Sequence, residues 1–403
     1  MKHLKIVVLL LFAVAAMSPL IFTHSVEGQG ATEAPTTDMD ARTNDLNNGF
    51  DAANFAANKT AFEGVEGLAD GLGPCYNDTS CVACHQSPDT GAASQISEFR
   101  AGHLDAFGNF VDAPGGSLIN DRAIASAIQE RISTTETIIS QRMSLSTLGD
   151  GFVECIDSNV LIANVNAQPA GQRGTLFSVP VFEAGNAPRT GRFGWKDQQA
   201  SLLSFSADAY LNEMGITSRL LPTENSSNGN SVAAFDGVAD PEDSENDIDA
   251  FAAFMRGLRA PGRGPITAQV TTGDSLFTQI GCAVCHTRSF TTAPPGTSIN
   301  GGAFAVPSAL GNKIIHPFSD FAMHDVGTGD GILQNGPAGS RNQIRTAPLW
   351  GVRSRIRLMH DGSARTVNDA ILAHFGQANP SVNNYINLSA TNKQALIAFI
   401  LSL

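Results

Sequence analysis

Apolar residues recur at helical spacing in corresponding places of two parts of the chain. Residues 54–67 and 273–281 have the pattern of short amphipathic helices. Far downstream of each, residues 247–258 and 395–403 predict a closing helix, in which an Ala-x-x-Phe-like rhythm places apolar side chains on one face. Strand signals are sparse, and only residues 175–182 suggest a short strand. The pattern therefore predicts a mainly α-helical chain with a duplicated plan.

A pentapeptide of the form Cys-x-x-Cys-His follows the first helix of each part. The two copies are Cys81-Val82-Ala83-Cys84-His85 and Cys282-Ala283-Val284-Cys285-His286. This spacing is typical of c-type haem attachment, in which both thiols add to the porphyrin vinyl groups and the His becomes the proximal iron ligand. We therefore expect two covalently bound haem c groups, with His85 and His286 as iron ligands. A Cys/His zinc site and a thioredoxin-like dithiol are the alternatives.

A helix, a haem motif, irregular loops and a closing helix make up the plan of a cytochrome c. A Pro/Gly-rich break at residues 260–265 separates two predicted cytochrome c-like haem domains, residues 49–262 and 263–403. The first domain is longer and carries an irregular insertion at about residues 117–230. The expected fold is mainly α, with two cytochrome c-like haem domains.

The N-terminal segment, residues 1–30, has the features of a signal peptide. Lys2 and Lys5 precede an apolar run at residues 6–22. An uncleaved anchor is the alternative, because the run is close to the shortest length that spans a bilayer; after cleavage we expect no stable membrane insertion. Residues 31–48 are rich in Thr, Asp, Asn and Ala and predict a disordered leader. Because c-type haem is attached outside the cytoplasm, we expect a periplasmic or exported protein.

Composition narrows the choice of partners. The formal net charge is −13 at pH 7, which argues against nucleic acid and favours a basic electron donor such as a small redox protein. Of the six cysteines, Cys75 and Cys155 lie outside the motifs. In an oxidising compartment they suggest a disulfide, with two buried free thiols as the alternative. No loop has an unambiguous oxygen-ligand spacing, so a calcium ion is not supported.

His374 is the best placed candidate for a sixth iron ligand. Thr366 and Asp369 predict a capping box that opens a short helix, and Gly376 ends it. His374 shares the apolar face of this helix with Ile371. Because a cytochrome c domain presents its distal ligand shortly before its terminal helix, we expect His374 to bind the second haem. The alternative is a core His that is satisfied by a carbonyl.

Other candidates remain beside it. Met359 and His360 are second choices as a haem ligand and as an imidazole near a haem edge. His103 follows the first motif within one loop, so it either reaches the first iron or lies on the surface. Arg345 and Arg365 are candidate partners for haem propionates, because a guanidinium binds a carboxylate with two hydrogen bonds.

Several segments together resemble the bacterial di-haem c-type oxidoreductases, which are often named peroxidases or thiol oxidoreductases. The likeness covers about residues 67–403, and its segments are residues 191–196, 212–217, 324–327, 345–351 and 360–362. More distantly, the second domain is similar to di-haem cytochrome c peroxidases and to the di-haem enzyme that matures the tryptophan tryptophylquinone cofactor. At the distal-ligand position of those relatives this chain has His374. The resemblance therefore implies a second haem with two His ligands that transfers electrons.

The same resemblance implies a reactive first haem with a carboxylate nearby for the cleavage of peroxide. Glu154 is the expected acid, and Gln129 and Glu130 are weaker candidates. The expected function is a periplasmic oxidoreductase in which electrons enter at the C-terminal haem and reduce peroxide, or another small oxidant, at the N-terminal haem. Trp195 or Trp350 is expected to lie between the haems or in the core. The alternatives are a non-catalytic di-haem electron carrier and a di-haem oxygenase or protein-modifying enzyme.

Overall fold

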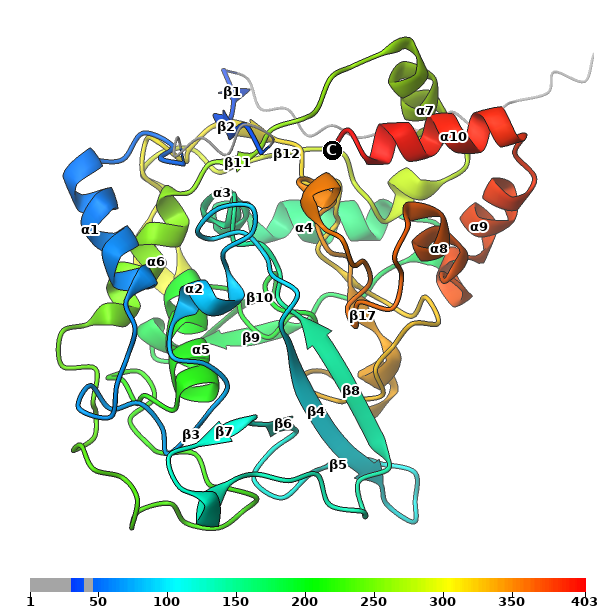
Figure 1. Ribbon diagram of the computed structural model, residues 1–403. Coiled ribbons are helices and arrows are strands. Elements are labelled where there is room, and N and C mark those ends of the chain that lie inside the picture. Colours follow the sequence, from blue (N-terminus) through cyan, green and yellow to red (C-terminus); the bar gives the residue numbers. More distant parts are fainter. Residues whose placement is uncertain (1–29, 40–45) are drawn as a thin grey trace, which may run out of the picture.

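The computed structural model describes residues 30–39 and 46–403 (Figure 1). Residues 1–29, which include nearly all of the predicted signal peptide, lie outside this range. No helix within the described part of the chain has the length and apolar character needed to cross a bilayer.

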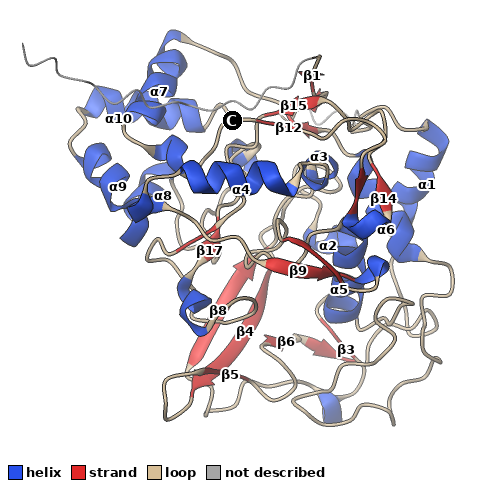
Figure 2. Cartoon of the chain, turned by 180° about the vertical axis from the view of Figure 1, so that it is seen from behind, coloured by secondary structure: helices blue, strands red, loops and turns tan. Residues whose placement is uncertain are grey.

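The helices gather in two groups on opposite sides of the molecule, and both views show this arrangement (Figures 1 and 2). Their bounds are α1 Ala52–Glu63, α2 Cys81–Cys84, α3 Asp150–Glu154, α4 Ser158–Ala167, α5 Leu202–Met214, α6 Asp247–Gly257, α7 Ala268–Gln279, α8 Val367–Leu372, α9 Asn379–Ile386 and α10 Ala390–Ile400. Helices α1, α2, α5 and α6 form one group, and α7 to α10 form the other. Helices α3 and α4 lie between them.

The strands are short and mostly paired in twos. Their bounds are β1 Thr32–Glu33, β2 Thr36–Thr37, β3 Cys75–Tyr76, β4 Ser97–Leu104, β5 Phe110–Asp112, β6 Leu118–Ile119, β7 Arg122–Ala123, β8 Ile138–Met143, β9 Ser178–Val181, β10 Ala187–Thr190, β11 Ala260–Pro261, β12 Phe290–Thr291, β13 Ser298–Ile299, β14 Phe304–Ala305, β15 Lys313–Ile315, β16 Met323–His324 and β17 Ile344–Arg345. The prediction of a mainly α fold is wrong in this respect, since 32% of the structure is helix and 17% is strand. Strand β9 falls within the short strand that was predicted.

The largest sheet combines β4 with β5, β6 and β8, and strands β4 and β8 extend away from both helix groups (Figure 2). Strand β8 lies inside the predicted irregular insertion and pairs antiparallel with β4, Glu98 opposite Arg142 and Arg100 opposite Ser140. Side chains two residues apart on a strand share a face, so Glu98, Arg100 and Arg142 point to the same side. The sequence pattern did not predict this sheet, because one face of β4 and β8 carries charged residues where an ordinary strand has alternating apolar residues.

The predicted duplication of helices is present in the packing. Helix α1 packs on α6, with the rings of Phe62 and Phe254 4.8 Å apart, and α7 packs on α10, with Phe277 and Phe399 5.2 Å apart. Gly273 makes the second contact close, because a Cβ there would lie 2.0 Å from the carbonyl oxygen of Ala395. Each helix that precedes a Cys-x-x-Cys-His motif thus packs against the closing helix of its own part of the chain.

The prediction of a disordered leader is wrong for the described residues between 31 and 48. Strand β1 pairs in parallel with β15, and β2 with β11. Leu46 is buried, and the Asn48 side chain donates hydrogen bonds to the carbonyls of Arg256 and Leu258. This segment has few apolar residues, but its backbone pairs with the edges of other strands. Backbone hydrogen bonds stabilise it, and amino-acid composition does not reveal them.

The apolar core does not divide at residues 262 and 263. A large cluster around α3, α5 and α6 also includes Phe290, Ile315 and Trp350 from the second part of the chain, and a smaller one surrounds α7 and α10. Cys155 is a free thiol inside the large cluster, and the free thiol of Cys75 donates to the carbonyl of Ile128 at 3.2 Å. The structure thus has two buried free thiols in place of the suggested disulfide.

Candidate haem sites and the cavity at the first motif

The first motif forms one helical turn that ends at its histidine. The Ser80 hydroxyl caps α2 by accepting from the amide of Ala83 at 3.3 Å. His85 follows the turn, and its Nδ1 lies 3.2 Å from the carbonyl oxygen of Ala92. Burial lowers the pKa of His85, so its imidazole is neutral near pH 7. With Nδ1–H donating to a carbonyl, Nε2 remains available to bind a metal.

The second motif repeats this geometry. Cys282–Val284 forms a single turn, and the Nδ1 of His286 lies 3.0 Å from the carbonyl oxygen of Phe318. Burial is the main reason that the pKa of His286 is lowered to about 4. The Phe277 ring lies 6.2 Å from His286 at 55°, and Phe62 lies 6.3 Å from His85 at 56°. Both motifs therefore present paired thiols and a neutral, oriented imidazole, and these groups fit a c-type haem.

The alternatives for the motifs fit less well. Burial raises the pKa of Cys81 and of Cys84 to about 12, so neither is a thiolate at neutral pH, as a reactive dithiol requires. Among the described residues, the metal-ligand cluster that includes a motif cysteine combines Cys285 with Asp320 and His324. It contains neither Cys282 nor His286, so it is not the zinc site that the motif spacing would make.

A cavity of about 260 Å³ opens beside His85. Its apolar lining includes Phe62, Phe251, Trp195 and Trp350, and the last of these comes from the second part of the chain. Arg345 and Arg355, also from the second part, complete the wall. A largely apolar pocket that also contains charged groups is the usual form of a cofactor or ligand site.

Two carboxyl groups, Glu98 and Glu213, meet at the polar end of the cavity. They are hydrogen-bonded to each other, and both line the cavity. Arg100 binds Glu98 through Nε at 2.7 Å and Nη2 at 3.0 Å, while Asn77 donates to Glu213 at 2.6 Å. Two hydrogen-bonded carboxyl groups share one proton, because both members cannot be charged without strong repulsion.

The environment decides which member holds the proton. Burial and the charge of Glu98 raise the pKa of Glu213 to about 8. Burial also opposes ionisation of Glu98, but Arg100 and Arg142 outweigh it and hold the pKa of Glu98 below its usual value. Glu213 lies in the last turn of α5, where the helix dipole disfavours negative charge. Glu213 is therefore protonated near neutral pH and Glu98 is ionised.

The sequence placed Glu213 in a family-like segment but gave it no role. Helix α5 begins at the cap of Ser201 and must end at Gly215, whose φ is +70° and whose Cβ would lie 2.6 Å from the carbonyl oxygen of Gly73. Glu213 lies in the last turn before this stop and lines the cavity. Asp150 and Asp208 also line the cavity, and burial raises their pKa values to about 7 and about 6. Neither forms a carboxyl pair with Glu98.

The structure contradicts the prediction that Glu154 is the acid. Glu154 is fully buried and does not line the cavity. Arg256 binds both of its oxygens, at 2.7 and 2.9 Å, and Leu202 N and Asn300 Nδ2 also donate to it. Although burial opposes ionisation, Arg256 lowers the pKa of Glu154 to about 2, so it has no proton to give at neutral pH.

The structure separates the weaker candidates for the first site. His103 lies on β4 with its Nδ1 2.9 Å from Glu136 and is not among the cavity-lining residues. The carboxylate of Glu130 accepts from the backbone amides of Asn120 and Asn228, and Gln129 donates to backbone carbonyls. In the structure these side chains hydrogen-bond to neighbouring groups outside the cavity, and Glu130 is buried.

The second site brings His374 near His286. His374 directly follows α8, which Thr366 caps as predicted. Its Nδ1 lies 2.6 Å from the carbonyl oxygen of Ala370, so Nε2 is available. Repulsion from His374 also lowers the pKa of His286, an interaction that requires the two imidazoles to be close. His374 therefore stays the predicted second ligand.

Three arginines are candidates for binding a haem propionate: the predicted Arg345 and Arg365, and Arg355, which the sequence analysis missed. Arg345 lines the cavity but donates to the Gly194 carbonyl and lies 3.8 Å from Asp197. Arg365 is exposed and does not line the cavity. Arg355 lines it and contacts the Ser144 carbonyl at 3.3 Å. Burial lowers the pKa of Arg355 to about 10, so Arg355 is a charged group suited to a propionate.

The remaining candidates, Trp195, Trp350 and His360, are all buried. Trp195 donates from Nε1 to the Met143 carbonyl at 2.8 Å, and its ring lies 6.1 Å from that of His360. His360 is buried, and its own carbonyl accepts from the amide of Met143. Trp195 and Trp350 are both buried in the core, as one of the two expected roles requires, and both line the cavity.

A family model described as "Di-haem oxidoreductase, putative peroxidase" matches residues 116–403. This chain belongs to the di-haem oxidoreductase family. The resemblance inferred from the sequence segments is thereby confirmed, and the family name implies haem cofactors. The first Cys-x-x-Cys-His motif precedes the matched range, so its assignment rests on the motif and its geometry.

Solved structures similar to this di-haem oxidoreductase share 16% sequence identity with it. Hydrazine synthase of Kuenenia stuttgartiensis covers 99% of this chain and 100% of its own, with a TM-score of 0.43. A MauG-like protein associated with microbial copper homeostasis covers 94% and 95%, with a TM-score of 0.41. The diheme peroxidase BthA of Burkholderia thailandensis covers 92% and 90%, also with a TM-score of 0.41. Likeness at this level does not transfer an activity. No curated protein matches the chain.

Proposed function

We propose that this di-haem oxidoreductase reduces peroxide in the periplasm, taking electrons from a small redox protein. The asymmetry of the two motif sites supports this reading. His286 is faced by His374, whereas His85 opens onto a cavity with a protonated carboxyl at its polar end. A site with two imidazole ligands suits electron entry, and an open cavity suits a small oxidant.

The two covalently bound haems would be held by Cys81, Cys84 and His85 at the first site and by Cys282, Cys285, His286 and His374 at the second. Haem supplies the iron that passes electrons to the oxidant. Reduction of peroxide follows H₂O₂ + 2e⁻ + 2H⁺ → 2H₂O, so the protein must also deliver protons. Glu213 holds a proton at the cavity, Glu98 with Arg100 keeps the neighbouring site charged, and the aromatic wall limits water. Glu213 therefore has the proton and the position at the cavity that a general acid needs to protonate the leaving oxygen.

The Glu213→Gln variant tests the acid. Removing a positioned general acid costs roughly 100- to 10,000-fold in rate, so peroxide turnover with a reduced cytochrome should fall by that range while both haems stay bound. Glu136→Gln is the matched control. Glu136 is also a buried carboxyl, but its partner is His103 and it does not line the cavity. Equal turnover in Glu213→Gln and in the control would reject the assignment.

Spectroscopy distinguishes the proposed enzyme from its alternatives. We expect one high-spin ferric haem that binds cyanide and one low-spin haem that does not. Two low-spin haems in every redox state would identify an electron carrier. A peroxide-generated oxidised state that reduced cytochrome does not discharge would identify an oxygenase or a protein-modifying enzyme.

A further inference from the structure

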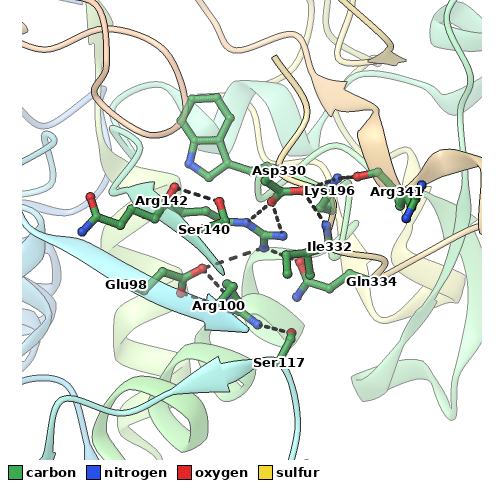
Figure 3. Close-up of polar contacts among 12 residues, drawn as sticks. Glu98, Arg100, Ser117, Ser140, Arg142, Lys196, Asp330, Ile332, Gln334 and Arg341 are labelled. Atoms are coloured by element: carbon green, nitrogen blue, oxygen red, sulfur yellow. Dashed lines mark hydrogen bonds and ion pairs between the residues drawn. The ribbon is translucent and has the colours of Figure 1, made fainter. Parts of the chain in front are cut away.

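A row of buried charges of alternating sign leads from the cavity into the second part of the chain (Figure 3). Arg100 binds Glu98, and Arg142 Nη1 lies 3.8 Å from Glu98. Arg142 then binds Asp330, which in turn binds Lys196. The side chains of Arg142, Lys196 and Asp330 are each 2% exposed or less. Charges buried this deeply must be paired, so each depends on its neighbour.

Asp330 is the contribution of the second part of the chain to this row. Its Oδ2 accepts from Arg142 Nε at 2.8 Å and lies 2.7 Å from Nη2, and its Oδ1 lies 2.8 Å from Lys196 Nζ. Lys196 Nζ also donates to the carbonyls of Arg341 and Gln343, at 2.7 Å each. One carboxylate thus balances two buried cations. Burial lowers the pKa of Lys196 to about 8, and Asp330 is the main group that opposes this.

Arg142 is shared between two carboxylates at unequal distances. It is in direct contact with Asp330 but 3.8 Å from Glu98, the partner of Glu213. Arg142 Nη1 also donates to the side chain of Gln334. We expect a weaker contact with Asp330 to let the guanidinium move toward Glu98, which lies opposite Arg142 in the β4–β8 pair. Positive charge closer to Glu98 and Glu213 favours loss of the shared proton.

We propose that Asp330 is a positioning residue for the first cavity: by holding Arg142 away from Glu98, it keeps the proton on Glu213. This inference deepens the proposed function and rests on it for its catalytic meaning. Other charged or titratable groups also act on the carboxyl pair or on its immediate neighbours. They are Arg100, Asp208, Asp78, Arg122 and Cys84. None of these is altered in the variants below.

Two substitutions at the far end of the row have opposite consequences. Asp330→Asn removes a negative charge and frees Arg142, so Glu213 should lose its proton at lower pH. Lys196→Gln removes a positive charge and leaves Asp330 wholly to Arg142, so Glu213 should lose its proton at higher pH. Loss of packing alone would not reverse its sign between two substitutions on the same contact.

The pH titration of the protonated carboxyl band in the infrared spectrum of the holoprotein measures this directly. The Glu213 band is the one missing from Glu213→Gln. We expect its midpoint to move by about one pH unit, a tenfold change in proton affinity, downward in Asp330→Asn and upward in Lys196→Gln. Asp330→Glu keeps the charge and should stay near the wild-type midpoint.

Equal midpoints in all variants, or shifts of the same sign, would overturn the proposal. If Asp330→Asn does not fold, Lys196→Gln decides alone, because an unchanged or lowered midpoint contradicts the proposal. The proposed function fails separately: wild-type protein with the expected band but no peroxide turnover would reject the peroxidase reading and leave the role of Asp330 in place.

Discussion

The two motif sites share a proximal side and differ in what faces the imidazole. In both, a single turn ends at a His whose Nδ1 contacts a carbonyl, at 3.2 Å for His85 and 3.0 Å for His286, with a Phe ring at the same angle. His374 acts on His286 by lowering its pKa, whereas His85 borders a cavity that Glu98 and Glu213 also line. A common haem-binding scaffold can thus present two different chemical sites.

The difference follows from where the facing groups come from. His374 lies just after α8, in the same part of the chain as His286. The cavity at His85 instead draws its walls from α5, the β4–β8 sheet and the second part of the chain, which contributes Arg345, Trp350 and Arg355 among other residues. The closed site is local, and the open site depends on contacts between distant segments.

Removing the thiols is the largest change that breaks the comparison. Cys81→Ala with Cys84→Ala, and Cys282→Ala with Cys285→Ala, should each leave one covalent haem in place of two, as measured by mass. Only the double variant of Cys81 and Cys84 should abolish cyanide binding to high-spin haem. Cys75→Ala is the control and should retain two haems. Protein with no covalent haem in the wild type would end the comparison altogether.

Replacing the imidazole that closes the second site should make the two sites alike. In His374→Ala we expect complete loss of the low-spin signal of the second haem, because its sixth ligand is gone, and a gain of cyanide binding there. Paramagnetic resonance of the oxidised protein measures both. His103→Ala serves as the comparison and should leave every haem signal unchanged. A persistent low-spin signal in His374→Ala would mean that another residue, such as Met359, binds that iron.

The buried pair of Glu154 and Arg256 should matter for stability but not for the cavity. Glu154→Ala leaves a buried guanidinium unpaired and should cost about 3–5 kcal/mol in the free energy of unfolding. Asp249→Ala breaks the exposed pair with Arg219 and should cost about 0–1 kcal/mol. Denaturant titration compares the two. Similar losses in the free energy of unfolding would contradict the view that the Glu154–Arg256 pair is buried and the Asp249–Arg219 pair is exposed.

The pH dependence of this pair has a definite sign. Because the pKa of Glu154 in the folded protein is depressed to about 2, its contribution is complete above its ordinary value of 4.5 and is lost as pH falls from there toward 2. Wild-type stability should therefore decline more steeply than that of Glu154→Ala over this range. The midpoint of the Glu213 titration should not move in Glu154→Ala.

The smallest expected effect concerns the helix crossing that closes the second site. Gly273→Ala places a Cβ against the Ala395 carbonyl and should destabilise the protein by about 1–3 kcal/mol through overpacking. Gly171→Ala is matched, because nothing lies within 4 Å of its Cβ position. Thermal unfolding followed at the haem absorbance should separate the two variants. Equal stability would show that α7 and α10 can move apart at little cost.

Sequence reasoning succeeded where the chemistry is local. The motif spacing, the individual helices and the Thr366 cap are each readable within a dozen residues. It failed for Glu154, which looked like an acid near the first site, because its partners Arg256 and Asn300 lie far along the chain. It also missed the β4–β8 sheet, whose charged face lacks the apolar alternation that identifies strands.

The chain by itself therefore determined the two attachment motifs, the duplicated helix plan and the family, because these depend on residue types at short, fixed spacings. Only the tertiary structure decided which carboxyl holds a proton at the cavity. Protonation depends on burial and on charges brought together from residues 98, 142, 213 and 330, and no local pattern records those distances.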